Sequence, residues 1–504
     1  MLAAGFFGSG LMVERKGERA LNFTSFAFIF FFPIVLMLHF LLPLKFRWVM
    51  LLIASYYFYI SWNPELIFLI LFTTAVSYSA GIVIEKSSSK ATRKFWLVMT
   101  LITSLGILFL FKYFNFLSVS VIEILNSIGM PTGEFYLKLI LPVGISFYTF
   151  QTLSYVIDVY RGDIPAEHHF GYYALFVSFF PQLVAGPIER PENLLPQLKL
   201  EYKFNTENAA IGGKRMLAGF FKKVVVADMI APYVNSVFND AENSTGLGVA
   251  VAAMLFGMQI YCDFSGYTDI AIGCARVMGI RLMQNFNNPY KAESIRDFWA
   301  RWHISLSSWF KDYLYIPLGG SRCSRPRHMT NLLIVFVISG LWHGANWTFV
   351  IWGFLHGLFQ VVGVMTKDIR GGIYKFFNVN IDSPFVHIYR KAITFILVCF
   401  AWIFFRANNT QELGVLLTKL FTDWGTAGEA FSLMGYTLIG VVITITSIFI
   451  VNVFDKRITG GVSQEGTVTK LSCGVPIYLT WAVIFAWIIL WSGNSVSSFI
   501  YFQF

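Results

Sequence analysis

Charged residues are scarce in this sequence. Only 13% of its 504 residues are Asp, Glu, Lys or Arg, whereas 56% are hydrophobic. An average soluble domain is roughly one quarter charged, and the deficit here extends along most of the chain. This composition argues against an ordinary soluble globular protein and predicts an integral membrane protein.

Cysteine is rare as well, and its positions follow no metal-binding or redox pattern. The sequence contains five cysteines, Cys262, Cys274, Cys323, Cys399 and Cys473, and no two of them form a CxxC pair. Because zinc sites and redox motifs commonly use such pairs, we predict neither a bound metal nor a redox site. Most of these cysteines lie in apolar runs, where cysteine usually acts as a small buried hydrophobe.

Three other patterns are missing. Apolar residues do not alternate with polar ones, as they would in the strands of a membrane β-barrel. No cleavable signal is evident, because the polar stretch 14–19 precedes an apolar run long enough to remain as an anchor. No internal repeat of fixed period is visible, and this argues against a transporter built from inverted repeats.

Basic residues outnumber acidic ones, with 38 Lys and Arg against 28 Asp and Glu and a net charge of +10. They gather in short loops, of which residues 85–94 are the clearest, and this is the pattern of a cytoplasmic membrane face. No long basic stripe with interleaved aromatic residues is present, so we expect no nucleic-acid partner. We expect membrane lipids to surround most of the chain instead.

Long apolar runs are what the sequence has in quantity. A spanning helix needs about 20 apolar residues, and that length predicts roughly 11 to 13 spanning or half-spanning helices. The clearest runs are 23–44, 48–62, 66–84, 95–111, 246–261, 392–405, 436–453 and 477–491. No polar linker is long enough to fold alone. We therefore expect an all-α polytopic membrane protein, with residues 1–504 in a single domain.

Two stretches cannot form continuous helices. Residues 141–163 are interrupted early by Pro142 and Gly144, and residues 176–198 contain four prolines. Each interior proline removes a backbone hydrogen bond, and broken, polar helices at membrane depth either line a cavity or are covered by protein. The second stretch predicts a re-entrant or kinked element with a loop after Pro187.

Charged side chains near the membrane predict two further features. Residues 209–230 carry basic side chains at positions 214, 215, 222 and 223, which share roughly one helical face. This spacing predicts an amphipathic helix at the cytoplasmic interface. Asp263 and Asp269 follow in an apolar run. They either line a tunnel or pair with Arg276 or Arg281, and ion pairing is the favoured alternative.

Two histidines stand in Trp- and Phe-rich segments. His303 lies in RDFWARWHISLSSWF and His343 lies in SGLWHGANW. An ionisable group at membrane depth is costly, and by default it marks a functional site that faces the protein interior. Histidine is also the most frequent general base. We therefore predict that residues 296–357 form the catalytic region and that both histidines line a buried tunnel.

Structural roles remain open for the histidines. Trp299, Trp302, Leu306, Trp309 and Phe310 recur at three- and four-residue spacing, which predicts one helix face that includes His303. On that face His303 could simply bond a backbone carbonyl.

The surroundings of His343 are likewise consistent with a functional role or a structural role. Gly340 and Gly344 flank it within a turn, and glycine permits either the close approach of a ligand or close helix packing. His356, 13 residues further on, is a weaker candidate for a direct role.

The loop after the first histidine segment has two interpretations. It reads PLGGSRCSRPRH and contains Arg322, Arg325, Arg327 and His328 beside a glycine pair. Arginine side chains and turn amides suit the phosphates of a nucleotide-like donor. A basic loop on the cytoplasmic face would have the same composition.

With these motifs in view, the chain resembles the membrane-bound O-acyltransferases, in particular the branch of bacterial alginate O-acetyltransferases. The resemblance runs over nearly the whole length. It is densest in LPVGISFYTFQTLSYVIDVYRG, LVAGPIERP, QIYCDFSGYTDIAIGCARVMGI, DFWARWHISLSSWFKDYLYIPLGGSR and GLWHGANWTFVIWGFLHG. It implies a ring of transmembrane helices around a central tunnel that joins the two membrane faces.

The resemblance also implies the site residues. His343, in the GLWHG motif, corresponds to the residue taken as catalytic in the family. His303, in the RWHISLS motif, corresponds to the second active-site position, where many relatives outside this branch have asparagine. The expected substrate-binding residues are Trp302, Ser307, Asp312, Arg322 and Asn346.

The activity implied by the resemblance is O-acetyl transfer in the bacterial cytoplasmic membrane. Acetyl-CoA would be the co-substrate, so no cofactor is expected, and the acceptor would be a hydroxyl of an alginate-like surface polysaccharide. An extracytoplasmic acetyltransferase-type partner protein would receive or complete the transfer. We expect His343 to act as the general base, and His303 or a nearby donor to stabilise the oxyanion or position the acyl group. The alternatives are D-alanyl or protein acyl transfer within the same family, and proton-coupled transport.

Overall fold

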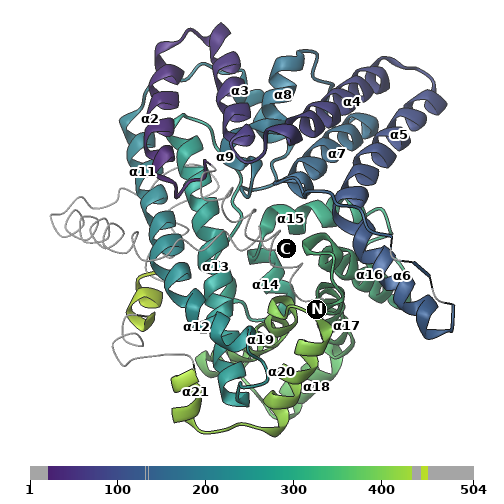
Figure 1. Ribbon diagram of the computed structural model, residues 1–504, viewed down its shortest axis with the longest axis vertical. Helices are drawn as coiled ribbons and strands as arrows, with labels where there is room; N and C mark the ends of the chain where they lie inside the picture. The colour runs from purple at the N-terminus through teal and green to yellow at the C-terminus, as the bar shows by residue number, and fades with distance from the viewer. Residues whose placement is uncertain (1–20, 131, 134, 434–443, 452–504) are drawn as a thin grey trace. The chain divides into compact units, whose positions relative to one another are not determined.

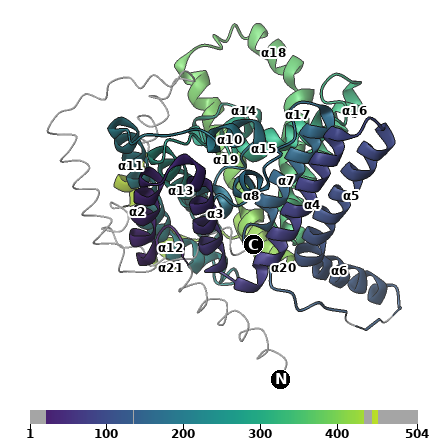
Figure 2. The same ribbon diagram turned by 90° about the horizontal axis from the view of Figure 1, so that it is seen from above.

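The computed structural model describes residues 21–130, 132–133, 135–433 and 444–451 (Figures 1 and 2). All regular elements within these ranges are helices, as predicted. The predicted span 477–491 and part of the span 436–453 lie outside the described residues. Contacts divide the chain into unit 1, residues 1–216 and 267–283, and unit 2, residues 217–266 and 284–504. One domain over residues 1–504 stays a prediction.

Five described helical segments are long and apolar enough to cross a membrane. They are Pro64–Lys86, Lys90–Ser127, Gly246–Val277, Trp347–Met365 and Pro384–Arg406. Helix α2 (Phe26–Leu41) is apolar but shorter. The segments confirm the polytopic all-α class, whereas the full number of spans and their arrangement around a tunnel stay predictions.

The first half of the chain supplies most of unit 1. Its helices are α2 (Phe26–Leu41), α3 (Leu44–Ile60), η1 (Pro64–Leu66), α4 (Ile67–Lys86), α5 (Lys90–Leu108), η2 (Phe109–Tyr113), α6 (Phe114–Ser127), α7 (Ile145–Arg161), α8 (Phe170–Ser178), α9 (Phe180–Leu183) and α10 (Pro191–Leu198). Helices α11 (Thr206–Phe220) and α13 (Gly246–Val277) each contribute residues to both units.

The remaining described helices belong to unit 2. They are η3 (Phe221–Ala227), α12 (Asp228–Phe238), η4 (Pro289–Lys291), α14 (Ile295–Arg301), α15 (Ile304–Phe310), η5 (Lys311–Tyr315), α16 (Arg325–His343), α17 (Trp347–Met365), α18 (Lys367–Phe376), α19 (Pro384–Arg406), α20 (Thr410–Thr422) and α21 (Ala427–Leu433).

The polar helix α7 is covered by protein, which was one of the two predicted alternatives. It packs beside α4 and α5 (Figures 1 and 2), and nearly all of its side chains are buried. Polar groups on the facing side of α4 are satisfied locally, since the Thr74 and Ser77 hydroxyls donate to carbonyl oxygens four residues back, at 2.6 Å in each case. The Tyr173 hydroxyl of α8 donates to Ser77 Oγ at 2.7 Å. These three buried hydroxyls are therefore all hydrogen-bonded.

Both predicted helix breaks are present. Helix α7 begins only after Gly144, whose φ of 74° is left-handed, and a Cβ at this position would lie 2.7 Å from the Leu183 carbonyl oxygen. Residues 176–198 form the end of α8, the short helix α9, a non-helical stretch over 184–190 and α10. Pro181 and Pro191 lie in the first turns of α9 and α10, and Pro187 lies in the non-helical stretch, where their missing N–H groups break no helical hydrogen bond. Pro196 is accommodated inside α10.

A buried glutamate holds the non-helical stretch to a distant part of the chain. Glu189 is fully buried, and one carboxyl oxygen accepts from the Met283 backbone N–H at 2.5 Å. The other oxygen accepts from Asn193 Nδ2 at 2.6 Å. Burial raises the pKa of Glu189 to about 7, although the two hydrogen bonds and the charge of Arg190 act in the opposite direction.

Replacing Glu189 with alanine should lower the unfolding free energy by about 1–3 kcal/mol, because two donors lose their acceptor in a buried site. Glu189→Gln keeps one acceptor oxygen and should cost less. Since the folded pKa lies above the usual value, protonation favours the folded state, and the advantage of Glu189 over alanine should grow as the pH falls from 7 towards 4.5. Thermal unfolding of the three proteins in detergent tests this. Equal melting temperatures at every pH would contradict it.

Residues 209–230 do not form one amphipathic helix at an interface, so that prediction was wrong. Helix α11 is followed by the π-helical turn η3 and then by α12. Lys222 and Lys223 lie in this turn and are only 2% and 3% exposed. A π-helical turn closes its hydrogen bonds over five residues instead of four, and this shift changes the face on which the two lysines lie.

The aspartates of α13 form ion pairs, as favoured, but their predicted partners were wrong. In unit 1, Asp269 Oδ1 lies 2.9 Å from Arg215 Nε. In unit 2, Lys223 Nζ lies 2.7 Å from Asp263 and 3.0 Å from Asp228. Burial acts to lower the pKa of Lys223, but the two carboxylates outweigh it and hold the pKa above its usual value. Two of the four basic side chains expected at an interface, Arg215 and Lys223, are therefore counter-ions of aspartates inside the protein.

Candidate active site

The chain around His303 is broken and does not form the single predicted helix. Helix α14 ends at Arg301 and α15 begins at Ile304. His303 lies between them with φ 43° and ψ 55°, a left-handed conformation that costs a non-glycine residue roughly 1–2 kcal/mol. The aromatic residues of this segment consequently do not share one continuous helix face, so that part of the prediction was wrong.

A distant segment of the chain replaces the missing helical hydrogen bonds. The backbone N–H of Asn287 donates to the Arg301 carbonyl at 2.9 Å, and the Ile304 N–H donates to the Asn285 carbonyl at 2.9 Å. These bonds satisfy backbone groups that the break would otherwise leave unpaired. The asparagines of the sequence QNFNNP were the available signal for this segment, since asparagine is common where helices are interrupted.

His303 is completely buried within unit 2. Its Nδ1 atom lies 3.1 Å from Asn285 Oδ1, and its ring packs edge-on against Phe264 with 4.7 Å between ring centres. The break between two seven-residue helices lies outside the candidate spans. Burial lowers the pKa of His303 to about 3, so the imidazole is neutral at physiological pH.

His343 is the last residue of α16 and is 4% exposed. Its ring lies 5.0 Å from the Trp352 ring and 5.4 Å from the Phe405 ring, centre to centre. Helix α16 packs closely on α17 near this end, because a Cβ at Gly340 would lie 3.1 Å from the Gly353 Cα. Gly340, which lies one turn before His343, therefore serves close helix packing, which was one of the two interpretations open for it.

One tryptophan contacts both histidines. The ring centre of Trp342 lies 6.0 Å from that of His303 and 5.0 Å from that of His343. Both imidazoles are buried in the same unit, so neither of them faces lipid. The structure thus brings together two histidines that are 40 residues apart in the sequence, as a shared site requires.

His356 shares a second tryptophan with His343, because the Trp352 ring centre lies 5.0 Å from each of these two imidazoles. It is completely buried on α17, and its Nδ1 accepts a hydrogen bond from Trp299 Nε1 at 3.2 Å. The rings of Phe298 and Phe336 are stacked against it. Its direct role in catalysis stays a weaker prediction.

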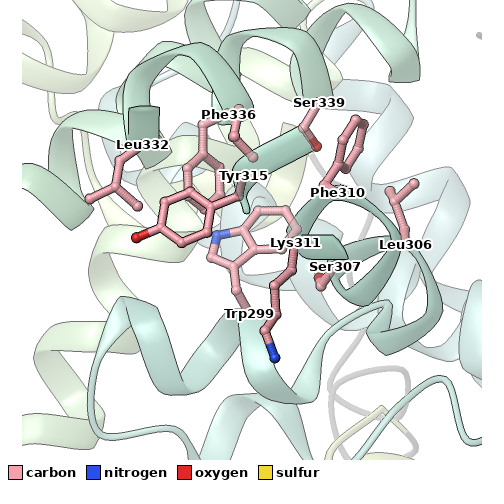
Figure 3. Close-up of a pocket in the computed structure, with 10 residues that line it drawn as sticks. Trp299, Leu306, Ser307, Phe310, Lys311, Tyr315, Leu332, Phe336 and Ser339 are labelled. Carbon is pink, nitrogen blue, oxygen red and sulfur yellow. The ribbon is translucent and has the colours of Figure 1, made fainter. Parts of the chain in front are cut away.

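A cavity of about 150 Å³ lies among α14, α15, η5 and α16 (Figure 3). Its lining residues are Trp299, Leu306, Ser307, Phe310, Lys311, Tyr315, Leu332, Val335, Phe336 and Ser339. The lining is almost entirely apolar, and Lys311 extends beside Trp299 with its amine directed away from the rings (Figure 3). Ser339 lies one helical turn before His343, and Ser307 lies one turn after His303, so the cavity adjoins the segments that carry both histidines.

The predicted substrate-binding residues have different surroundings. Ser307 lines the cavity, and Asp312 lies on η5 between the cavity residues Lys311 and Tyr315. Arg322 is exposed in the turn after the glycine pair. Their roles stay predictions. Lys311, Tyr315 and Phe336 were not anticipated, because their approach depends on how η5 meets α16.

Two of the predicted residues already have structural contacts. Trp302 is fully buried among aromatic rings, with Phe286 and Trp402 each 5.1 Å away between ring centres. Asn346 caps α17, since its Oδ1 accepts from the Thr348 N–H at 3.0 Å and its Nδ2 donates to the Asn408 carbonyl at 2.9 Å. Substrate contacts of both residues stay predictions.

The described residues also bear on a possible metal site and on the basic loop that could bind phosphate. Among the described residues, no three His, Cys, Asp or Glu side chains gather as a metal site would require. Arg325 and Arg327 of the basic loop are exposed, and each lies near backbone carbonyl oxygens at 3.3–3.4 Å. Binding of donor phosphates by this loop and its role as a plain basic loop of the cytoplasmic face both stay predictions.

Comparisons with known proteins show the family of this chain. The family model of the membrane-bound O-acyltransferases matches residues 163–370, which include both histidines. A probable alginate O-acetylase of Pseudomonas aeruginosa is 41% identical over 404 residues, covering 79% of this chain and 75% of the relative. The probable alginate O-acetylase of Azotobacter vinelandii is 35% identical over 515 residues, covering 96% of this chain and 100% of the relative. A peptidoglycan O-acetyltransferase of Helicobacter pylori is 37% identical over 388 residues, covering 72% of this chain and 71% of the relative.

The second of these relatives aligns with nearly the entire chain, and the apolar helices agree with a membrane location. The two buried histidines lie in the motifs by which the sequence resembled this family. The chain is therefore a multi-pass membrane acyltransferase of the membrane-bound O-acyltransferase family.

Proposed function

We propose that this protein transfers the acetyl group of acetyl-CoA to a hydroxyl of a cell-surface polysaccharide, from a position in the bacterial cytoplasmic membrane. The observation that supports this most directly is the contact of two buried imidazoles with the same Trp342 ring. An apolar cavity adjoins the segments that carry both histidines. The lining of this cavity includes neither histidine. The two imidazoles are buried among aromatic rings with little water present, which strengthens electrostatic interactions in the transition state.

His343 acts as the general base in this proposal. It takes the proton of the acceptor hydroxyl, and the hydroxyl oxygen attacks the carbonyl carbon of the thioester. The tetrahedral intermediate then collapses, the C–S bond breaks, and the CoA thiolate leaves. His343 returns the proton to the thiolate, so the products are the acetyl ester and free CoA thiol. No covalent acyl-enzyme is needed.

The cavity suits the thioester end of the donor. Its walls are aromatic and aliphatic, and its polar groups include the Lys311 amine and the Ser307 and Ser339 hydroxyls. A short acyl group fits apolar walls, while the phosphates of CoA require cations. Lys311 and the exposed arginines of residues 322–327 provide cations in the same unit.

The relatives' names support a polysaccharide acceptor. Two are described as alginate O-acetylases and a third as a peptidoglycan O-acetyltransferase. We place the acceptor hydroxyl on a comparable surface polymer, reached directly or through an extracytoplasmic acetyltransferase-type protein. D-alanyl transfer, protein acylation and proton-coupled transport are the competing functions.

Purified protein in lipid nanodiscs should release CoA thiol from radiolabelled acetyl-CoA when alginate oligosaccharides are supplied, and label should appear as alkali-labile ester. A D-alanyl carrier protein offered as the donor should not be consumed. Cleavage of the D-alanyl thioester without cleavage of acetyl-CoA would indicate the D-alanyl alternative. Solute or proton movement without any thioester cleavage would indicate transport.

A further inference from the structure

We propose that Asn285 is a positioning residue that holds His303 in the tautomer with the proton on Nδ1, so that Nε2 presents a lone pair and not a proton to the substrates. This inference rests on the proposed function for its chemical consequence. The tautomer itself follows from contacts within unit 2.

The orientation of the Asn285 amide is fixed by a group that can only donate. The backbone N–H of Ser305 lies 3.2 Å from the Asn285 side-chain atom assigned as Oδ1. A backbone N–H has no acceptor capacity, so a flipped amide would bring two donors together. The Ser305 hydroxyl lies 2.8 Å from the same atom and can donate to it. The hydrogen-bond network therefore identifies this atom as oxygen, which is how amide orientation has to be decided.

The same oxygen then determines the tautomer of His303. His303 Nδ1 lies 3.1 Å from Asn285 Oδ1. A carbonyl oxygen only accepts, so an unprotonated Nδ1 would place two lone pairs against each other, whereas Nδ1–H makes a hydrogen bond. The Ser305 hydroxyl, 3.4 Å from Nδ1, can accept part of the same proton. In the neutral imidazole, protonation of Nδ1 leaves the lone pair on Nε2.

The backbone makes this arrangement rigid. The Asn285 carbonyl accepts from the Ile304 N–H, and the Asn287 N–H donates to the Arg301 carbonyl. Asn285 thus binds the chain after His303 through its main chain and its side chain, and Asn287 binds the chain before it. A left-handed residue persists only where its surroundings hold it firmly, and such residues are common at functional sites.

This tautomer changes the role expected for His303. A neutral imidazole with its lone pair on Nε2 can accept a hydrogen bond from an N–H or O–H group of the substrates, but it cannot donate from that atom to an oxyanion. The proton of the reacting hydroxyl goes to His343, so a bond to His303 comes from another donor of the substrates. Of the two roles expected for His303, the geometry favours positioning over oxyanion stabilisation. Asn285, Ser305, Phe264 and Trp342 surround the imidazole within the unit, and none of these four side chains carries a charge. The titratable group of α16 that shares the Trp342 ring is His343.

Asn285→Asp tests the proposal through the titration of His303 itself. The substitution keeps an acceptor oxygen beside Nδ1 and adds a negative charge, which stabilises the imidazolium form. The pKa of His303, followed by ¹⁵N NMR, should therefore rise from about 3 by about one unit or more. Asn285→Leu removes the oxygen and should lower kcat about 10-fold or more, with little change in the KM for acetyl-CoA.

The signals of His356 are the internal control, because this buried histidine bonds Trp299 and not Asn285, and they should not move. A folded Asn285→Asp protein in which His303 titrates as in the wild type would overturn the positioning role.

The tautomer has a readout that is independent of activity. The protein contains 8 histidines, so solid-state NMR of the ¹⁵N-histidine-labelled wild type in lipid is tractable. Comparison with His303→Gln identifies the signals of His303. We expect them to show protonated Nδ1 and unprotonated Nε2, and the reverse pattern would overturn the inference. If the wild type fails to cleave acetyl-CoA, the proposed function fails, and the NMR result still decides the tautomer.

Discussion

His343→Ala is expected to lower the rate of acetyl transfer by about 10²–10⁴-fold, the usual contribution of a positioned general base. The side chain is buried at the end of α16 and contacts Trp342, Trp352 and Phe405. Helix packing at this position depends on Gly340 and Gly353, which the substitution leaves intact. The loss should therefore fall on kcat, while folding and acetyl-CoA binding persist.

The measurement compares single-turnover transfer from acetyl-CoA in purified wild type and His343→Ala, together with equilibrium binding of a non-cleavable acetyl-CoA analogue. His39→Gln is the control, because it alters a buried histidine of unit 1, whose Nε2 lies 3.0 Å from the Met278 carbonyl oxygen. The control should retain transfer within several-fold. A folded His343→Ala protein with an unchanged transfer rate would refute the assignment of the base.

Lys223→Met is expected to destabilise the protein by about 3–5 kcal/mol, the cost of breaking a buried charge network by removing one partner. The amine lies 2.7 Å from Asp263 and 3.0 Å from Asp228, and all three side chains are nearly inaccessible to solvent. Methionine fills a similar volume and cannot compensate the two carboxylates. Two negative charges would then remain together in a poorly solvated site.

Thermal and denaturant unfolding in detergent should show this loss as a lower melting temperature and a lower transition midpoint. The triple variant Lys223→Met, Asp228→Asn, Asp263→Asn removes all three charges and should recover much of the stability, because uncharged replacements avoid the desolvation cost of a lone ion. If Lys223→Met unfolds at the wild-type midpoint, the charge network of Lys223, Asp228 and Asp263 does not stabilise the folded protein. Equal losses for the single and triple variants would show that packing, not charge, is responsible.

Composition and local sequence determined the class of this protein and the places where its helices fail. Scarcity of charge over the whole length predicted a membrane protein, because unpaired charges are costly in lipid. Pro142, Gly144 and the prolines of residues 176–198 predicted breaks that the structure contains. These features depend on neighbouring residues alone, since a proline removes its own backbone donor wherever the chain places it.

The family motifs identified the two histidines, but only the tertiary structure decided how they are held. The spacing of residues 299–310 favoured one helix, and backbone hydrogen bonds from residues 285–287 broke it at His303. The basic positions of residues 209–230 predicted a solvated face, and the turn η3 placed Lys223 against two aspartates instead. Which donor meets which acceptor across the folded chain is a non-local property. Local periodicity assigns a residue to a face, but the partner that satisfies a buried charge or backbone group depends on which segments the fold brings beside it.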